Sequence, residues 1–180
     1  MIKYDASYYY NLLKIHTHTA KAICQVRWDF ILQLMPEFER RHPLVLDYGC
    51  GVGWFAAFKP NNFEVDTYDI MPVPQTGITQ DKYDIVTMWD VLEHIPDFTE
   101  LEPILKKTEF VALTLPVKPE GVDWRDWHHF KPGEHLHYYT KDLLEALFYM
   151  YGFELKIEGT PECPPRVNAH SFIFKRNGKK

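Results

Sequence analysis

Three glycines at alternate positions follow an acidic residue at the end of an apolar run. The run is 44–46, and it leads through Asp47 into Gly49, Gly51 and Gly53. Glycine permits positive φ angles and lets a ligand approach the backbone without a Cβ in the way. A helix beginning after such a turn would direct its unpaired N–H groups at a ligand carboxylate. This segment is therefore a candidate ligand-binding turn.

Two familiar glycine-rich motifs do not fit this turn. The third glycine of a dinucleotide fingerprint would fall at Trp54, and no Lys-Ser/Thr pair follows to make a P-loop.

A second carboxylate closes the next predicted strand. Asp69 lies twenty residues after Gly49, the separation at which an acidic residue reaches a ribose. Asp66, three residues earlier, competes for the same role.

A third group of chemically active side chains follows a later apolar segment. Asp90, Glu93 and His94 are spaced i, i+3 and i+4, so they share one face of a helical turn. His94 could act as a general base toward a hydroxyl group, because the pKa of imidazole lies near neutrality. Alternatively, the three side chains could hold a divalent cation together with His135 or His137. A third interpretation gives Glu93 and His94 a structural role in the following turn.

The order of these motifs resembles one enzyme superfamily. The pattern D-x-G-x-G-x-G after an apolar strand is similar to motif I of the class I S-adenosylmethionine-dependent methyltransferases. Segment 82–97 is similar to the "fD-strand-xVLEHipD" signature of the small-molecule branch, which includes ubiquinone-pathway O-methyltransferases. Segment 135–140 is similar to the family's "HlhyfT" segment, so the resemblance covers most of residues 44–175. Some relatives with Glu-x-x-Glu-His use a metal, whereas this chain has Asp90 at the first position.

The resemblance implies a role for each motif residue. Asp47 would serve the cationic methionine portion of the cofactor, Asp69 the ribose hydroxyls, and Trp89 would line the centre. The expected cofactor-binding residues are Asp47, Gly49, Cys50, Gly51, Gly53, Asp69, Ile70, Met71 and Trp89. The expected catalytic residues are His94, Glu93 and His137, and no metal ligand is assigned. Relatives place a helix and a strand after the ribose-binding residue, but 70–82 contains no clear strand. Either this layer is shortened here, or apolar residues such as Ile70 and Met71 hold adenine.

The predicted elements that position these residues alternate between strands and helices. Apolar spacing predicts a helix over 20–35 that ends at Pro36, a short helix over 101–107, and a helix that Thr140 caps. The last helix should bury Leu143, Leu144, Leu147 and Phe148 and end at Gly152. Strands are predicted over 44–46, 63–69, 83–89 and 110–115, with two more around Phe153–Ile157 and Phe172–Phe174.

This order predicts an α/β fold with a single doubly wound, Rossmann-like, mostly parallel sheet. Helices should cover both faces, and a C-terminal antiparallel strand pair should close the sheet. The whole chain, 1–180, is interpreted as one methyltransferase domain, with an N-terminal helical extension over 1–40 and the core over 41–180. Loop 117–137 contains Trp124, Trp127 and Phe130, and is predicted to form a lid. Tyr4, Tyr8, Tyr9 and Tyr10 could pack over the same opening.

Composition narrows the class of partner and compartment. The 180 residues carry a net charge of −5, which argues against nucleic acid and membrane surfaces, and no apolar run has the length of a membrane span. Three scattered cysteines and the absence of a secretory leader predict a cytoplasmic protein. The predicted function is methyl transfer from S-adenosylmethionine to an oxygen, or less favourably a nitrogen, of a small-molecule acceptor. The alternative functions are a catalytically degenerate cofactor-binding or scaffold protein and a nucleic-acid or protein methyltransferase. Dependence on a divalent cation is a further, less favoured alternative, and the sequence leaves the oligomeric state open.

Overall fold

The computed structural model describes residues 17–38, 42–71, 73–164 and 166–178 and contains one six-stranded sheet. The strands are β1 (Leu44–Tyr48), β2 (Glu64–Tyr68), β3 (Tyr83–Trp89), β4 (Thr108–Pro116), β5 (Phe153–Gly159) and β6 (Ala169–Arg176). The α-helices are α2 (Thr17–Leu32), α3 (Trp54–Ala57), α4 (Glu102–Leu105) and α5 (Lys141–Met150). Short 3-10 helices cover Met35–Phe38, Leu92–His94 and Phe98–Leu101. No helix in this part of the chain is long and apolar enough to cross a membrane.

The strand order places a switch point at the end of the sheet where ligands bind. The order is β2-β1-β3-β4-β6-β5, and the first four of these strands are parallel. Strand β6 runs antiparallel between β4 and β5. The connection after β1 leads to β2 on one side, whereas the connection after the neighbouring strand β3 leads to β4 on the other side, and this opens a crevice at the carboxyl ends of β1 and β3. The predicted parallel sheet with a C-terminal antiparallel pair is confirmed.

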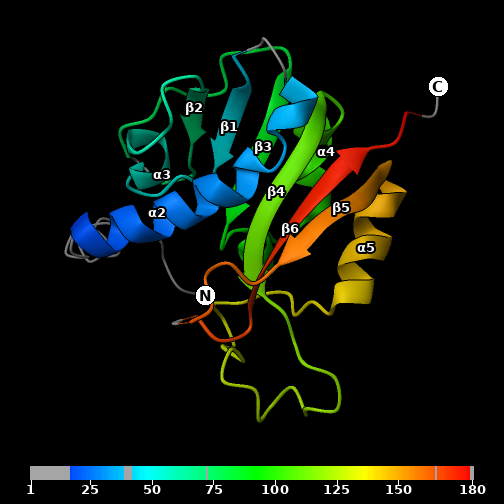
Figure 1. The fold of residues 1–180 in the computed structure, drawn as a ribbon. Helices are drawn as coiled ribbons and strands as arrows, with labels where there is room; N and C mark the ends of the chain where they lie inside the picture. The colour runs from blue at the N-terminus through cyan, green and yellow to red at the C-terminus, as the bar shows by residue number, and fades with distance from the viewer. Residues whose placement is uncertain (1–16, 39–41, 72, 165, 179–180) are drawn as a thin grey trace.

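Helices cover both faces of this sheet, as predicted (Figure 1). On one face, Trp28 and Ile31 of α2 and Phe55 of α3 belong to a buried cluster with inward-facing residues of β1, β3 and β4. On the other face, Leu105 of α4 and Phe148 of α5 pack in a second cluster against the alternate residues of the same strands. Strands buried on both faces have continuous apolar sequences, which is why β3 and β4 could be located from the sequence.

The predicted helix boundaries agree with the structure in part. Thr140 caps α5, and its hydroxyl oxygen accepts a hydrogen bond from the Leu143 N–H over 3.3 Å. Gly152 follows the end of this helix with a φ of 80°. Leu143, predicted to face the core, is 50% exposed, because its N–H in the first turn faces the cap and its side chain points to solvent. The first predicted helix begins at Thr17 rather than at residue 20 and ends at Leu32, before the 3-10 turn.

The short segment after β2 replaces a further strand with side-chain hydrogen bonds. Thr76 Oγ1 accepts from the Thr67 N–H over 2.8 Å, and Gln75 Oε1 accepts from the Asp69 N–H over 2.7 Å. In return, the Gly77 N–H donates to the Thr67 carbonyl oxygen over 3.0 Å. Among the described residues of 70–82 there is no strand, in agreement with the sequence. The peptide groups of Thr67 and Asp69 at the end of β2 are bonded by two side chains and one backbone N–H instead.

Candidate active site

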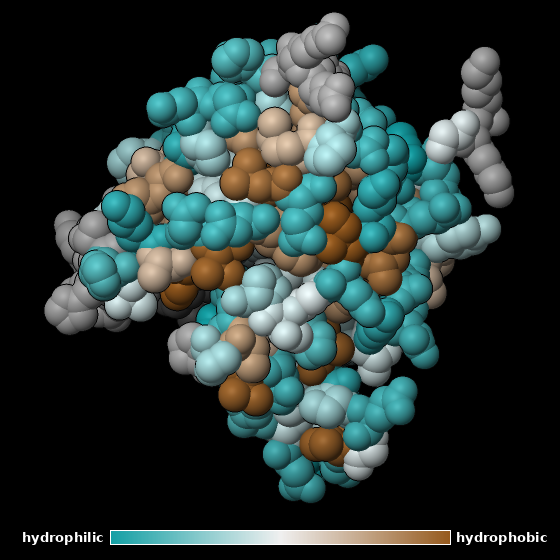
Figure 2. Space-filling view, viewed as in Figure 1, coloured by the Kyte–Doolittle hydropathy of each residue, from teal (hydrophilic) through white to brown (hydrophobic). Residues whose placement is uncertain are grey.

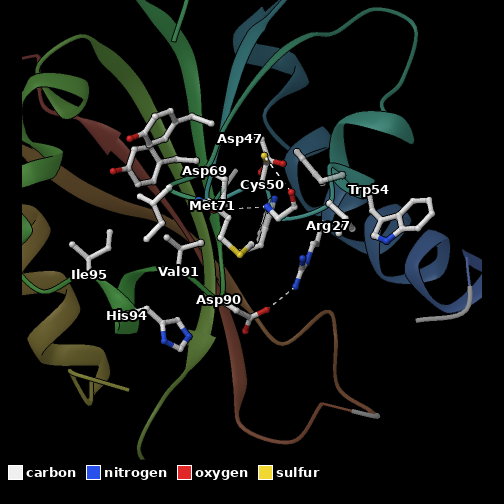
Figure 3. Close-up of a pocket in the computed structure, with 18 of the residues that line it drawn as sticks. Arg27, Asp47, Cys50, Trp54, Asp69, Met71, Asp90, Val91, His94 and Ile95 are labelled. Carbon is white, nitrogen blue, oxygen red and sulfur yellow. Dashed lines mark hydrogen bonds and ion pairs between the residues drawn. The ribbon is translucent and has the colours of Figure 1, made fainter. Parts of the chain in front are cut away.

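A cavity of about 440 Å³ lies where β1, β2 and β3 end (Figure 3). Its lining comes from the glycine turn after β1, from the residues that follow β2 and β3, from one face of α2, and from Arg166 in the connection between β5 and β6. In Figure 2 the surface is hollowed beneath α2, above the projecting segment 117–137. This volume is within the range of small-ligand sites.

The glycine turn has the backbone geometry that the sequence predicts. Gly49, Gly51 and Gly53 all have positive φ angles, of 77°, 54° and 77°. A Cβ on Gly49 would collide with the Cγ2 atom of Val91, whereas a Cβ on Gly53 would meet no atom within 4 Å. Gly49 is therefore required both for its conformation and for the close approach of the loop after β3.

The N–H groups of the turn are largely used inside the protein. Gly49 and Cys50 both donate to the carbonyl oxygen of Tyr68, over 2.7 and 3.1 Å, and Gly51 donates to Asp69 Oδ2 over 2.7 Å. The helix that follows, α3, has only four residues. That the first N–H groups of this helix face a ligand stays a prediction.

Asp47 is buried beside the turn and lines the cavity. It is 2% exposed, and Thr87 Oγ1 donates to its Oδ1 over 2.9 Å. Burial raises the pKa of Asp47 to about 7, although the Thr87 hydrogen bond and the charge of Arg27 act in the opposite direction. A cationic group in the cavity would stabilise the ionised form of this carboxyl.

The structure places Asp69 at the cavity and Asp66 away from it. Asp69 is buried, accepts from the N–H groups of Gly51 and Met71 over 2.7 and 2.8 Å, and lines the cavity. Asp66 is not part of the cavity wall and instead accepts a hydrogen bond from the Tyr83 hydroxyl of β3 over 2.7 Å. The ribose-binding role of Asp69 stays a prediction, and its position is compatible with that role.

The other predicted cofactor residues also line the cavity. Cys50, Ile70, Met71 and Trp89 are all part of its wall. Met71 and Trp89 are buried, whereas Ile70 is 76% exposed. Burial raises the pKa of the Cys50 thiol to about 12, so this cysteine is a packing group and not a nucleophile.

A ring of four charged side chains at the cavity was not foreseen. Asp90 has a φ of 59° and accepts from Arg27 Nη2 over 2.9 Å and from Arg166 Nη1 over 3.0 Å. Both arginines also bind Glu162, which is 4% exposed. Burial alone would raise the pKa of Asp90, but the two guanidinium groups outweigh burial and hold it below its ordinary value. Arg27 lies on the face of α2 that turns to the cavity, a signal available in the sequence, whereas Glu162 and Arg166 lie in an irregular segment that gives none.

Glu93, His94 and His135 come together beside the cavity, and Asp90 is not in this group. One ligand atom from each of the three residues lies within 4.8 Å of the others. Glu93 is buried, and its Oε2 has no hydrogen-bond partner among the described residues. Burial, followed by the charge of Asp90, raises the pKa of Glu93 to about 8. The predicted helical face fails to form because Asp90 is in the left-handed region and Leu92–His94 is a 3-10 turn.

The histidines predicted to be catalytic differ in their relation to the cavity. His94 lines it, and its Nδ1 lies 2.9 Å from the Glu134 carbonyl oxygen. His137 is exposed, its Nε2 lies 3.4 Å from the Pro96 carbonyl oxygen, and it is not part of the cavity wall. Glu93 lies beside His94, with Oε1 3.9 Å from His94 Nε2.

Segment 117–137 projects from the carboxyl end of the sheet (Figure 1). Its aromatic residues pack among themselves: the Trp124 and Phe130 rings are 4.5 Å apart, and Trp127 is buried next to His129. None of its described residues contributes to the cavity wall. Its role as a lid stays a prediction, and the four N-terminal tyrosines lie outside the described residues.

Comparisons with known proteins agree with this fold and site. A family model described as "Methyltransferase domain" matches residues 16–156, and the chain belongs to this family. The predicted class, a class I S-adenosylmethionine-dependent methyltransferase, is thereby confirmed, whereas assignment to the ubiquinone-pathway branch stays a prediction. No match was found among curated protein sequences.

Solved structures share the fold at low sequence identity. Magnesium protoporphyrin IX methyltransferase from Synechocystis PCC 6803, determined with bound S-adenosylhomocysteine, is 18% identical over 90% of this chain and 84% of that chain, with a TM-score of 0.60. The 1,6-didemethyltoxoflavin-N1-methyltransferase of Burkholderia thailandensis is 13% identical over 95% and 84%, with a TM-score of 0.65. The 16S rRNA methylase ArmA is 15% identical over 93% and 90%, with a TM-score of 0.53. The likeness therefore covers nearly the whole fold and spans enzymes with different acceptors.

Proposed function

We propose that the protein transfers the methyl group of S-adenosylmethionine to an oxygen atom of a small-molecule acceptor. The observation that carries this proposal is the position of His94 in the wall of the same cavity as Asp47 and Asp69. A base for the acceptor and two carboxylates for the cofactor thus face one space. The volume of that space supports a small acceptor, and transfer to nitrogen is the less favoured alternative.

The cofactor half of the cavity is the end nearest the glycine turn. Asp47 would bind the methionine ammonium group, and Asp69 would bind the ribose hydroxyls. Met71 and Ile70 offer apolar surface for adenine, and Trp89 lies toward the reacting centre. Gly49, Cys50, Gly51 and Gly53 shape the turn around the cofactor. S-adenosylhomocysteine bound to the Synechocystis neighbour supports the same cofactor here.

The proposed chemistry is a direct displacement at the sulfonium methyl group. The Glu134 carbonyl oxygen can only accept a hydrogen bond, so Nδ1 of His94 carries the proton and Nε2 is the basic nitrogen. Nε2 would take the hydroxyl proton of the acceptor as its oxygen attacks the methyl carbon. Glu93, whose Oε1 lies 3.9 Å from the same Nε2, is proposed to help position the His94 ring. His137 was predicted in a similar role, but its exposed position makes His94 the stronger candidate.

A divalent cation is a second candidate for activating the acceptor. The observation that favours it is the buried, unpartnered Oε2 of Glu93 beside His94 and His135. Nδ1 of each histidine lies at a backbone carbonyl, 2.9 Å for His94 and 3.0 Å for His135, which favours the tautomer in which Nε2 is unprotonated, the form that ligates a metal. A cation held there would lower the pKa of an acceptor hydroxyl.

Charge and cysteine state support the rest of the proposal. The net charge of −5 disfavours a nucleic-acid acceptor, although one structural neighbour is an rRNA methylase. Cys24, Cys50 and Cys163 are all free, which supports a reducing, cytoplasmic compartment. A degenerate cofactor-binding protein of the same fold is the alternative that an activity measurement decides.

The deciding experiment measures methyl transfer from labelled S-adenosylmethionine to a panel of hydroxylated small molecules and sugars. The proposal predicts that His94→Ala lowers turnover about 10²–10⁴-fold and leaves cofactor affinity unchanged. Under the metal alternative, a chelator abolishes turnover, Mg²⁺ restores it, and Glu93→Gln is as damaging as His94→Ala. Cofactor binding without turnover on any acceptor would support the degenerate protein instead.

A further inference from the structure

The projecting segment 117–137 returns to the sheet at the turn that follows β3. The Leu136 N–H donates to the Glu93 carbonyl oxygen over 2.8 Å, and His94 Nδ1 lies 2.9 Å from a carbonyl oxygen of the segment. The backbone of the segment is thus bonded to both residues of the turn. These contacts bring His135, near the end of the segment, beside Glu93 and His94.

The three side chains offer ligand atoms at nearly the spacing of a metal site. One ligand atom from each lies within 4.8 Å of the others, and Glu93 Oε1 is 3.9 Å from His94 Nε2. The His94 and His135 ring centroids are 4.9 Å apart. Ligand atoms on one tetrahedral zinc ion lie roughly 3.3 Å apart at the usual bond lengths, so side-chain shifts of about 1 Å would complete the site.

An unpartnered carboxylate oxygen is a second, independent observation at this place. The Glu93 side chain is 3% exposed, and its Oε2 has no hydrogen-bond partner among the described residues. The contact of its Oε1 with His94, at 3.9 Å, is too long for a hydrogen bond. A buried carboxylate without a partner is costly, and a bound cation would remove this cost. The methyl-transfer chemistry proposed above makes no use of Oε2.

The ligand types select one class of metal ion. Backbone carbonyl oxygens at Nδ1 of His94 and of His135 favour the tautomer in which Nε2 is unprotonated, as in many metal sites. Two imidazole nitrogens with one carboxylate oxygen suit zinc and similar transition-metal ions. Magnesium and calcium prefer ligand sets made of oxygen alone. The set therefore favours zinc over magnesium.

The position of the three ligands decides what a bound ion would do. His94 is part of the cavity wall, whereas Glu93 and His135 are buried outside the wall. Figure 3 shows His94 at the margin of the cavity, apart from Asp47 and Asp69. An ion held by all three ligands would lie in the wall and not in the cavity. It is therefore poorly placed to bind an acceptor oxygen, but it would occupy Nε2 of His94.

We propose that Glu93, His94 and His135 form a zinc site whose occupation inhibits methyl transfer by withdrawing His94 Nε2 from catalysis. An unprotonated imidazole nitrogen has one lone pair, so Nε2 cannot bind zinc and accept a proton at the same time. Water would complete the four-coordinate ion. The inhibition rests on the proposed function, because it requires His94 as the base, whereas zinc binding does not. Activation of the acceptor by the same cation is the competing outcome.

The first test measures zinc binding to the full chain without cofactor or acceptor. The protein is treated with a chelator, which is then removed, and ZnCl₂ is titrated by calorimetry. We expect one zinc ion per chain with a Kd of about 1 µM or lower, and no binding of Mg²⁺ in the same micromolar range. His135→Ala and Glu93→Gln each remove one ligand and should weaken zinc binding at least about tenfold.

The second test measures turnover with and without zinc. Saturating zinc should lower the turnover of the unaltered protein about 10²-fold or more, to the level of His94→Ala. The same zinc concentration should inhibit His135→Ala much less, because this variant does not hold the ion. His42→Ala is the matched control: it removes an exposed histidine that precedes β1, at the opposite end of the sheet. Its zinc affinity and its inhibition by zinc should equal those of the unaltered protein.

Several results would overturn the proposal. Absence of zinc binding, or unchanged affinity in Glu93→Gln, would exclude the site, and the second of these decides even if His135→Ala fails to fold. Zinc binding that leaves turnover unchanged would exclude inhibition, and a rise in turnover would favour the activating cation instead. If the unaltered protein methylates no acceptor, the proposed function and the inhibition fall together, whereas calorimetry still decides the zinc site.

Discussion

Affinity for S-adenosylhomocysteine should fall as the pH drops below neutrality, because Asp47 must be ionised to bind the ammonium group. The pKa of Asp47 in the empty protein is raised to about 7 by burial. Only the ionised fraction is competent to bind, so the apparent dissociation constant should increase roughly tenfold between pH 8 and pH 6. Calorimetric titrations at half-unit steps from pH 5.5 to pH 8 measure this slope.

Asp47→Asn separates the charge from the shape of this residue. An asparagine oxygen can still accept the Thr87 hydrogen bond, so the fold should survive. The variant should bind S-adenosylhomocysteine weakly and with no slope over the same pH range. Glu93→Gln is the matched control, because the pKa of Glu93 is also raised, to about 8, and yet Glu93 does not line the cavity. Its binding slope should equal that of the unaltered protein.

The same pKa has the opposite effect on the stability of the empty protein. The folded protein holds a proton on Asp47 between about pH 4 and pH 7, where the unfolded chain does not. The protonated Asp47 therefore contributes at most about 4 kcal/mol to the free energy of unfolding. This stabilisation is fully present below about pH 4 and is lost as the pH rises through about 7. Asp47→Asn should therefore raise the melting temperature of the empty protein at pH 7.5. A flat binding profile in the unaltered protein, or normal affinity in Asp47→Asn, would refute the assignment.

Three further outcomes follow from the geometry. Asp69→Ala should weaken the binding of S-adenosylhomocysteine about tenfold or more, whereas Asp66→Ala should lower the melting temperature and leave this affinity intact. Calorimetry measures the affinity and thermal unfolding the stability, and the reverse pattern would show that the wrong carboxylate was assigned. Gly49→Ala should abolish binding or folding, because it adds a collision to an unfavourable φ, while Gly53→Ala should cost only about 1–2 kcal/mol in a denaturant titration. Thr140→Ala should destabilise the protein by about 1 kcal/mol through loss of the helix cap, with no change in cofactor affinity.

The sequence predicted the parts of the fold in which local pattern and tertiary environment agree. Strand β3 has the predicted bounds because its residues are apolar on both faces, and α5 was located by Thr140 and Gly152, whose roles are local. Asp47 and Asp69 were placed at the ligand end because each closes a parallel strand. The cavity contains both residues, although their ligand contacts remain predictions.

The ring of four charged side chains could not be predicted because its contacts are non-local. Asp90 bonds to Arg27, 63 residues earlier, and to Arg166, 76 residues later. Arg27 lies within the predicted helix, but its position there does not reveal its partners, and Arg166 lies in an irregular segment. The spacing of Asp90, Glu93 and His94 predicted one helical face, but a left-handed residue and a 3-10 turn change the directions of these side chains. His135 reaches Glu93 instead because the chain returns there from a long loop, with the Leu136 N–H bonded to the Glu93 carbonyl oxygen.

The side-chain hydrogen bonds along the outer edge of β2 also bear on how this protein meets other chains. An edge strand with unpaired peptide groups is a template for strand addition and for aggregation. Here Thr76 and Gln75 occupy the peptide N–H groups of Thr67 and Asp69, and Gly77 occupies the Thr67 carbonyl oxygen. A strand from a neighbouring molecule would have to displace these contacts before it could pair with this end of β2. The compact 70–82 segment therefore protects the sheet against self-association as well as shaping the wall of the cavity.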